Sequence, residues 1–127
     1  MKFLVLMIPE VYQPGKKVDP NFIPPMDKMK RMMAFNDELA TAGALLSLNG
    51  LQPLANGARV TITNNKPTVT DGPFIEAKEV VGGYWMLEAK SKQEVIEWMK
   101  KCPAEPGDTI EIRPLFEMAD FPMEVNK

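Results

Sequence analysis

Apolar residues near the start of the chain form an uninterrupted run over residues 3–8, which Pro9 and Glu10 close. The run is far shorter than the ~20 apolar residues that a membrane-spanning helix needs. Strands that are buried on both faces typically show continuous runs of this kind. We therefore predict a buried strand over residues 2–8, and we expect neither an export signal nor a membrane partner.

Two later segments have apolar positions at helical spacing. A first helix is predicted over residues 26–42, and Gly43 is a suitable C-terminal stop. Its broad apolar face contains Met29, Met32, Met33, Phe35, Leu39 and Ala42. A second helix is predicted to begin at a capping box of Ser91 and Glu94 and to stop at Pro103. Its buried side contains Val95, Ile96, Met99 and Cys102.

The other apolar segments have the pattern of strands. Further strands are predicted over residues 45–51, 82–89 and 109–116. Residues 59–63 alternate with a period of two and return as residues 67–70, and Asn64 and Asn65 between them tolerate positive φ, so a short hairpin is predicted. Pro67 indicates a sheet edge. The proline-rich, polar residues 9–25 are expected to form a surface excursion.

The resulting order is strand, helix, strand, hairpin, strand, helix, strand. It predicts an α+β fold of the ferredoxin-like βαββαβ type with an inserted β-hairpin. Two helices can cover only one face of such a sheet, yet the first strand is apolar on both. We expect a second copy of the chain to cover the other face in a two-fold homodimer. The alternative is that residues 9–25 or the C-terminal tail fold over it.

Length and charge narrow the class of protein. The 127 residues suit a single domain, 1–127, with a core over about residues 1–117 and a tail over 118–127. The 17 acidic and 15 basic residues are scattered, which argues against direct nucleic-acid binding. The single cysteine, Cys102, excludes an intrachain disulfide and a multi-cysteine metal site, and favours a reducing, cytoplasmic setting.

Histidine is absent from the chain. This excludes histidine-dependent triads and histidine-ligated metal sites. It also removes the side chain whose unperturbed pKa lies nearest neutrality. A general acid or base would have to be a carboxylate, a lysine or a tyrosine with a shifted pKa. We expect no metal and no cofactor.

The densest group of functional side chains follows the predicted hairpin, in the segment from Asp71 to Glu79 and on to Gly82-Gly83. Asp71-Gly72-Pro73 is first of all a turn sequence. The same segment carries the carboxylates of Asp71, Glu76 and Glu79 and the cation of Lys78. Loops between strands often carry sites, although solvated loops have the same composition.

Arg113 lies on the last predicted strand, on the face opposite Ile110 and Ile112. If those isoleucines pack against the helices, Arg113 points to the other face of the sheet. A buried guanidinium there would need a carboxylate or an anionic ligand. The alternative is an ordinary cross-strand pair with Glu111, Glu117 or Glu88.

Three other features each have a structural and a functional interpretation. The methionines at positions 26, 29, 32 and 33 could line an adaptable apolar pocket, although core packing also explains them. Tyr84 and Trp85 could stack on a ligand or simply pack within a strand. Cys102 is predicted at a helix C-terminus, where the dipole disfavours a thiolate, so we do not expect it to be a nucleophile.

An ordered set of short motifs spans nearly the whole chain. The motifs are Gly50-Leu51-Gln52-Pro53, Thr70-Asp71-Gly72-Pro73-Phe74 with Glu76, Lys78-Glu79 and Gly82-Gly83, Glu97-Trp98, and Ile110-Glu111-Ile112-Arg113-Pro114 with Glu117. Together these motifs resemble the DGPF branch of the YCII-related family. The resemblance implies a dimeric α+β barrel, in which ferredoxin-like subunits pair sheet to sheet, and a pocket near the Asp71 loop and Arg113.

The resemblance says less about function. Some YCII-related proteins are thought to use a histidine-aspartate pair, which this chain cannot supply because it lacks histidine. Other DGPF proteins resemble partners of extracytoplasmic-function sigma factors. The resemblance therefore suggests association with a sigma factor in a regulatory setting.

Our first hypothesis is a dimeric module that binds a small organic molecule or regulates a partner. Its ligand-binding residues would be Asp71, Gly72, Pro73, Phe74, Glu76, Lys78 and Arg113. The alternative is a cofactor-independent enzyme acting on a small organic molecule, with Asp71 or Glu76 as the base and Arg113 stabilising negative charge. A purely structural or interaction dimer is a third possibility.

Overall fold

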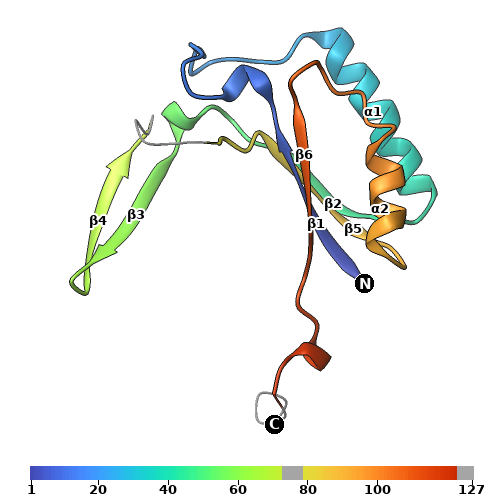
Figure 1. Cartoon of the computed structure of the whole chain (residues 1–127). Coiled ribbons are helices and arrows are strands. Elements are labelled where there is room, and N and C mark those ends of the chain that lie inside the picture. Colours follow the sequence, from blue (N-terminus) through green and yellow to red (C-terminus); the bar gives the residue numbers. More distant parts are fainter. Residues whose placement is uncertain (73–78, 123–127) are drawn as a thin grey trace.

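The central sheet of the computed structural model, which describes residues 1–72 and 79–122, has the strand order β2-β5-β1-β6 (Figure 1). Each neighbouring pair of its strands is antiparallel. The strands are β1 (Lys2–Ile8), β2 (Leu45–Gly50), β5 (Gly83–Glu88) and β6 (Thr109–Pro114). With the hairpin set aside, this is the 4-1-3-2 order of a ferredoxin-like sheet, so the predicted α+β fold is confirmed.

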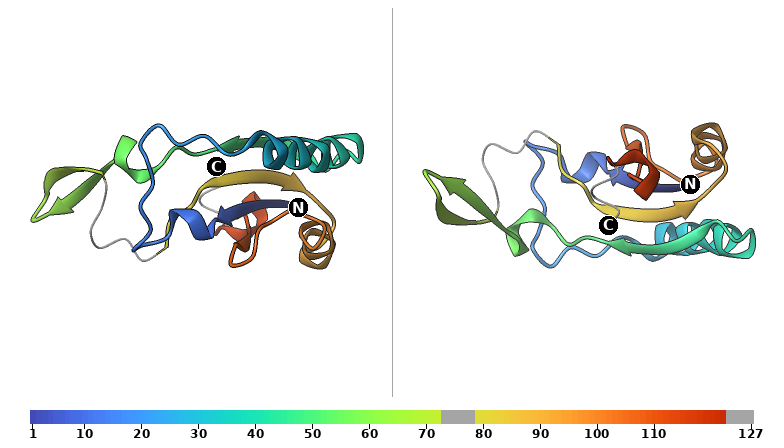
Figure 2. Two further views of the ribbon diagram at one scale, coloured as in Figure 1. Left: turned by 90° about the horizontal axis from the view of Figure 1, so that it is seen from above. Right: turned by 90° about the horizontal axis from the view of Figure 1, so that it is seen from below.

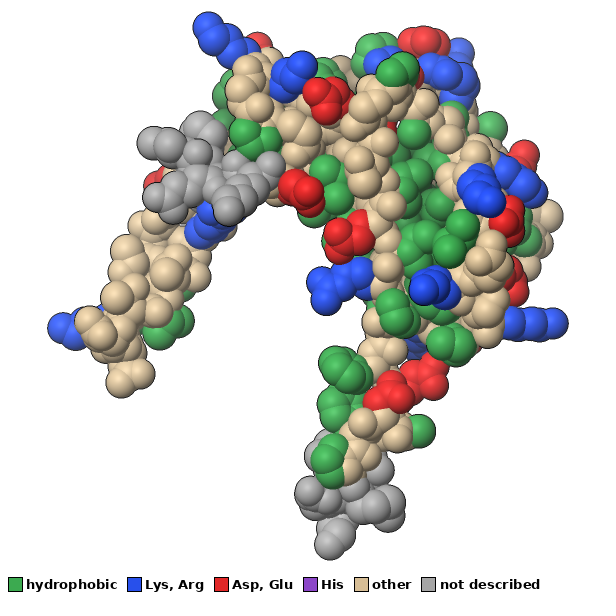
Figure 3. Space-filling model, viewed as in Figure 1, with side chains coloured by type: hydrophobic (Ala, Val, Ile, Leu, Met, Phe, Trp, Pro, Cys, Tyr) green, Lys and Arg blue, Asp and Glu red, His purple; other side chains and the backbone are tan. Residues whose placement is uncertain are grey.

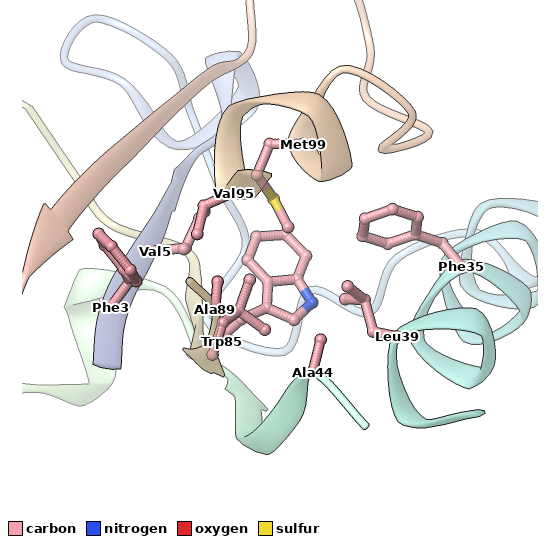
Figure 4. Close-up of a cluster of buried hydrophobic side chains, with 10 residues drawn as sticks. Phe3, Val5, Phe35, Leu39, Ala44, Trp85, Ala89, Val95 and Met99 are labelled. Atoms are coloured by element: carbon pink, nitrogen blue, oxygen red, sulfur yellow. The ribbon is translucent and has the colours of Figure 1, made fainter. Parts of the chain in front are cut away.

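Helices α1 (Met26–Thr41) and α2 (Lys92–Met99) lie on the same side of this sheet (Figure 1). Between them and the sheet lies the core, which centres on Trp85 (Figure 4). The Trp85 ring meets the Phe35 ring edge to face, with centroids 6.2 Å apart. The largest fully buried side chains are Phe3, Val5, Leu39, Leu87 and Val95. We call this side of the sheet the closed face.

The helix ends follow local signals. After α1, Gly43 adopts a φ of 75°, the left-handed conformation that commonly ends helices at glycine. Two members of the predicted apolar face, Met33 and Ala42, are exposed, so that part of the prediction is wrong. At α2, the Ser91 hydroxyl accepts a hydrogen bond from the Glu94 N–H at 3.2 Å, as the predicted capping box requires. The Glu94 carboxylate, however, accepts from the Lys90 N–H and not from the Ser91 N–H, so the second bond of the box does not form.

The inserted hairpin pairs β3 (Ala58–Thr63) with β4 (Lys66–Asp71). Asn64 and Asn65 have φ values of 50° and 65°, as the two central residues of a type I′ turn require. Every residue of the two strands is exposed. The hairpin projects from the body of an elongated molecule, at the end opposite the helices (Figure 2).

No helix of the described chain covers the other face of the sheet, which we call the open face (Figure 1). Its centre is formed by half-buried apolar side chains, those of Leu4, Leu6, Tyr84 and Met86. The described part of the C-terminal tail leaves the sheet rather than folding over it. The last strand, predicted over residues 109–116, ends already at Pro114, and Phe116 beyond it is 79% exposed.

Candidate functional site

The structure places Asp71 and Arg113 on different elements. Asp71 is the exposed last residue of the hairpin strand β4, whereas Arg113 is exposed on the outer strand β6, where it pairs with Leu4. In the described chain, no hydrogen bond or ion pair joins Arg113 to Asp71 or to Glu111, Glu117 or Glu88. The single chain therefore leaves the two predicted site residues apart.

Gly72 has a clear structural role next to Asp71. Its N–H donates to the Gly57 carbonyl at 2.9 Å, and a Cβ at this position would overlap the Leu54 carbonyl. Only glycine permits so close a backbone approach. The other predicted ligand-binding residues, Pro73, Phe74, Glu76 and Lys78, lie outside the described residues.

A cavity of about 430 Å³ lies elsewhere, between α1 and the closed face of the sheet. Its volume falls within the range typical of small-molecule sites. The wall supplied by α1 contains Met29, Met32, Met33 and Asn36, at the spacing that puts residues on one side of a helix. Met29 and Met32 are half-buried, while Met33 is 61% exposed at the opening. Of the four methionines considered for a pocket, Met29, Met32 and Met33 line this cavity and Met26 does not, while Met32 also packs against the core.

The floor of the cavity comes from the sheet. Leu48 and Trp85, which pair across β2 and β5, line it together with Met7 of β1. The Trp85 Nε1–H donates a hydrogen bond of 2.8 Å to the Asn36 Oδ1 atom. This bond links the floor to the α1 wall and holds the indole in place.

The rim carries charges that are already paired. A Glu105 oxygen lies 3.2 Å from the Arg31 Nη2 atom and 3.7 Å from the Lys28 Nζ atom. The two oxygens of Asp108 accept backbone N–H bonds from Glu10 and Glu105, each at 2.8 Å. Both of these rim carboxylates, those of Glu105 and Asp108, therefore already have partners.

Residues beside the cavity tie distant parts of the chain together. The Gln13 side chain donates to the Val80 carbonyl and accepts from the Val80 N–H, each at 3.0 Å. Tyr12 donates from its hydroxyl to the Leu51 carbonyl at 3.1 Å, and burial raises the pKa of this tyrosine. A Cβ on Gly82 would lie 2.5 Å from a ring carbon of Pro9. Gln13 could not be predicted from the sequence, because one glutamine in a polar loop carries no local pattern.

The described residues offer neither a metal-ligand cluster nor a reactive thiol. Among the described residues, no three Asp, Glu, Cys or His side chains gather as metal ligands would. Burial, and to a smaller degree the charge of Asp108, raises the pKa of the Cys102 thiol to about 11. This shift disfavours the thiolate that a nucleophilic cysteine needs. The lining is largely apolar, and its charged members, Lys28, Glu105 and Asp108, have partners within the described chain.

In the described residues, no helix has the length and apolar character needed to cross a membrane.

The comparison with family models agrees with the motif pattern, whereas no curated protein matches the chain. The model of the YCII-related domain matches residues 4–119, from the first strand to beyond β6. The chain thus belongs to the YCII-related family.

Proposed function

We propose that this YCII-related protein is a homodimeric module that binds a small organic molecule in the cavity between α1 and the sheet. The single observation that carries the proposal is the cavity itself, at about 430 Å³ with a methionine wall and an aromatic floor. Unbranched methionine side chains adapt their shape to different ligands. A binding or regulatory role therefore suits the site better than one fixed reaction.

The open face of the sheet supports the homodimer. Half-buried apolar side chains occupy its centre, and a two-fold axis would let the same patch cover itself. The hairpin adds exposed Val60, Ile62 and Val69, and the tail adds exposed Phe116. Figure 3 shows apolar side chains on the sides of the hairpin and of the tail that face the hollow between them. A second chain seated on the open face would cover these groups as well.

The predicted polar site of Asp71, Glu76, Lys78 and Arg113 belongs to this proposal as a second pocket. Because the hairpin and β6 are apart in one chain, such a pocket depends on how the dimer brings these elements together.

The alternative function, a cofactor-independent enzyme, has weaker support. A carboxylate base active near neutrality needs burial, and Asp71 is exposed. A cytoplasmic setting and association with a sigma factor stay predictions.

The neutral fluorescent probe N-phenyl-1-naphthylamine tests the cavity. We expect a saturable rise in its fluorescence with the wild-type protein, and at least about tenfold weaker binding to Met29→Trp, because the indole would fill the space. Met26→Trp is the matched control, since Met26 lies on the same helix but outside the lining, and it should bind within about twofold of wild type. Equal binding by the two variants would contradict the assignment of the cavity.

Sedimentation velocity tests the homodimer. The wild-type chain should sediment as a dimer, and Leu6→Glu should sediment as a monomer, because the substitution buries a carboxylate in the apolar centre of the open face. Ile23→Glu is the control, because Ile23 is 75% exposed on the excursion. A monomeric wild type, or a dimer that persists in Leu6→Glu, would refute this assembly.

A further inference from the structure

Building on the proposed function, we infer the chemical class of the ligand: a neutral, largely apolar molecule with a hydrogen-bond acceptor that Asn36 binds through its amide nitrogen. One end of the Asn36 side chain is already engaged, which decides what the other end can bind. Asn36 thereby becomes a residue that determines which ligands the cavity accepts.

Trp85 decides the orientation of the Asn36 amide. An indole N–H can only donate, so its partner at 2.8 Å must be the amide oxygen of Asn36. The amide nitrogen of Asn36 is then left with its two donors. Within residues 1–72 and 79–122, no hydrogen bond from this nitrogen is present. Asn36 is half-buried and lines the cavity, so a bound molecule is the natural acceptor.

The charges at the rim argue against an ionic ligand. An anion entering the cavity would meet the carboxylates of Glu105 and Asp108, while the lining cation Lys28 is already engaged with Glu105. A cation would find both carboxylates occupied, Glu105 by basic side chains and Asp108 by backbone N–H groups. Desolvating a charge without a free partner is costly. A neutral ligand avoids this cost.

The remaining lining specifies an apolar body. Met29, Met32, Leu48 and Trp85 surround the space beside Asn36. Aromatic rings pack well against methionine sulfur and against indole. The site therefore suits an aryl ketone, ester or ether better than an amino acid, a sugar or a phosphate.

Three probes of nearly equal shape separate these classes. They are 2-acetylnaphthalene, which is neutral with an acceptor, 2-ethylnaphthalene, which lacks the acceptor, and 2-naphthoate, which is anionic. We would titrate each into ¹⁵N-labelled protein at pH 7.5 and follow the Trp85 indole resonance, assigned with Trp98→Phe. The ketone should bind wild type about two- to tenfold more tightly than the hydrocarbon, the usual worth of one hydrogen bond. The naphthoate should bind most weakly.

Asn36→Asp is the matched variant, because its carboxylate still accepts from Trp85 but has no N–H to donate. The preference for the ketone over the hydrocarbon should fall to about one in this variant. If Asn36→Asp does not fold, Asn36→Leu removes the same donor and carries the same expectation.

The outcomes separate this inference from the proposed function. Equal binding of both neutral probes to wild type, an unchanged preference in Asn36→Asp, or tightest binding by the naphthoate would overturn the ligand class while leaving the cavity a binding site. Failure of all three probes to bind would refute the proposed function itself.

Discussion

The two faces of one sheet differ sharply in this protein, although adjacent residues supply them. On β1, Phe3 and Val5 are fully buried on the closed face, whereas Leu4 and Leu6, between and after them, are only half-buried on the open face. All four are apolar, so hydrophobicity does not distinguish them. The difference lies in the cover, since α1 and α2 pack on one side only (Figure 1).

The two faces also show two different kinds of incomplete packing. On the closed face, the gap beside Trp85 has a defined volume, a hydrogen-bonded wall and paired charges at its rim. The open face is a broad surface flanked by an exposed hairpin and tail. The first has a volume typical of small-molecule sites, and the second has no helix over it within the described chain. Four experiments test this distinction between the two faces.

The largest effect is expected for Leu87→Ala on β5. Leu87 is fully buried, so its truncation should lower the free energy of unfolding by ~2–5 kcal/mol. Met86→Ala, one residue earlier on the open face, should cost under ~1.5 kcal/mol at protein concentrations low enough for the monomer, and more as the concentration rises. Urea unfolding of each variant at two protein concentrations measures both losses. Equal, concentration-independent losses would remove the distinction between the faces.

A smaller effect is expected for Ser91→Ala, which removes the N-cap of α2. Because α2 has only eight residues and covers the closed face, the loss should be about 1 kcal/mol. Ser47→Ala is the control on the other face, where Ser47 is exposed on β2, and it should change stability by less than ~0.5 kcal/mol. Thermal unfolding followed by circular dichroism compares the two. An unchanged stability of Ser91→Ala would mean that packing alone stabilises α2.

The third experiment uses pH to probe the interior of the closed face. Because folding raises the pKa of Cys102 from 9.0 to about 11, the unfolded chain releases its thiol proton first as pH rises. The stability due to the neutral thiol is complete below pH 9 and is lost between about pH 9 and 11. The stability of wild type relative to Cys102→Ala should therefore fall over this interval. A constant difference would place the thiol in water.

The smallest effect on the folded monomer is expected for Val60→Thr on the hairpin. Val60 is 63% exposed, so the free energy of unfolding at low concentration should change by no more than ~0.5 kcal/mol. If the hairpin contacts a second copy, the dimer dissociation constant should nevertheless rise, because the threonine hydroxyl would be buried there. Sedimentation equilibrium measures this constant. A large loss of monomer stability would show that the hairpin packs within its own chain.

Local signals in the sequence determined most of the elements and their order. Paired asparagines specify the turn between β3 and β4, Ser91 begins α2, and Gly43 follows α1 with positive φ. Each depends on the conformation of a few consecutive residues, so it can be predicted from them. The apolar periodicity likewise predicted α1 and the strands of the sheet, and with them the ferredoxin-like fold.

Which side chains meet depends on the packing of whole elements against one another. Asn36 and Trp85 are 49 positions apart, and Gln13 and Val80 are 67 apart, yet each pair is joined by a hydrogen bond of 3.0 Å or less. The same holds for the methionines, since periodicity put Met29, Met32 and Met33 on one side of α1 but not beside a cavity. A spacing shows which residues share a side of an element. What that side touches depends on packing between elements, which no local pattern encodes.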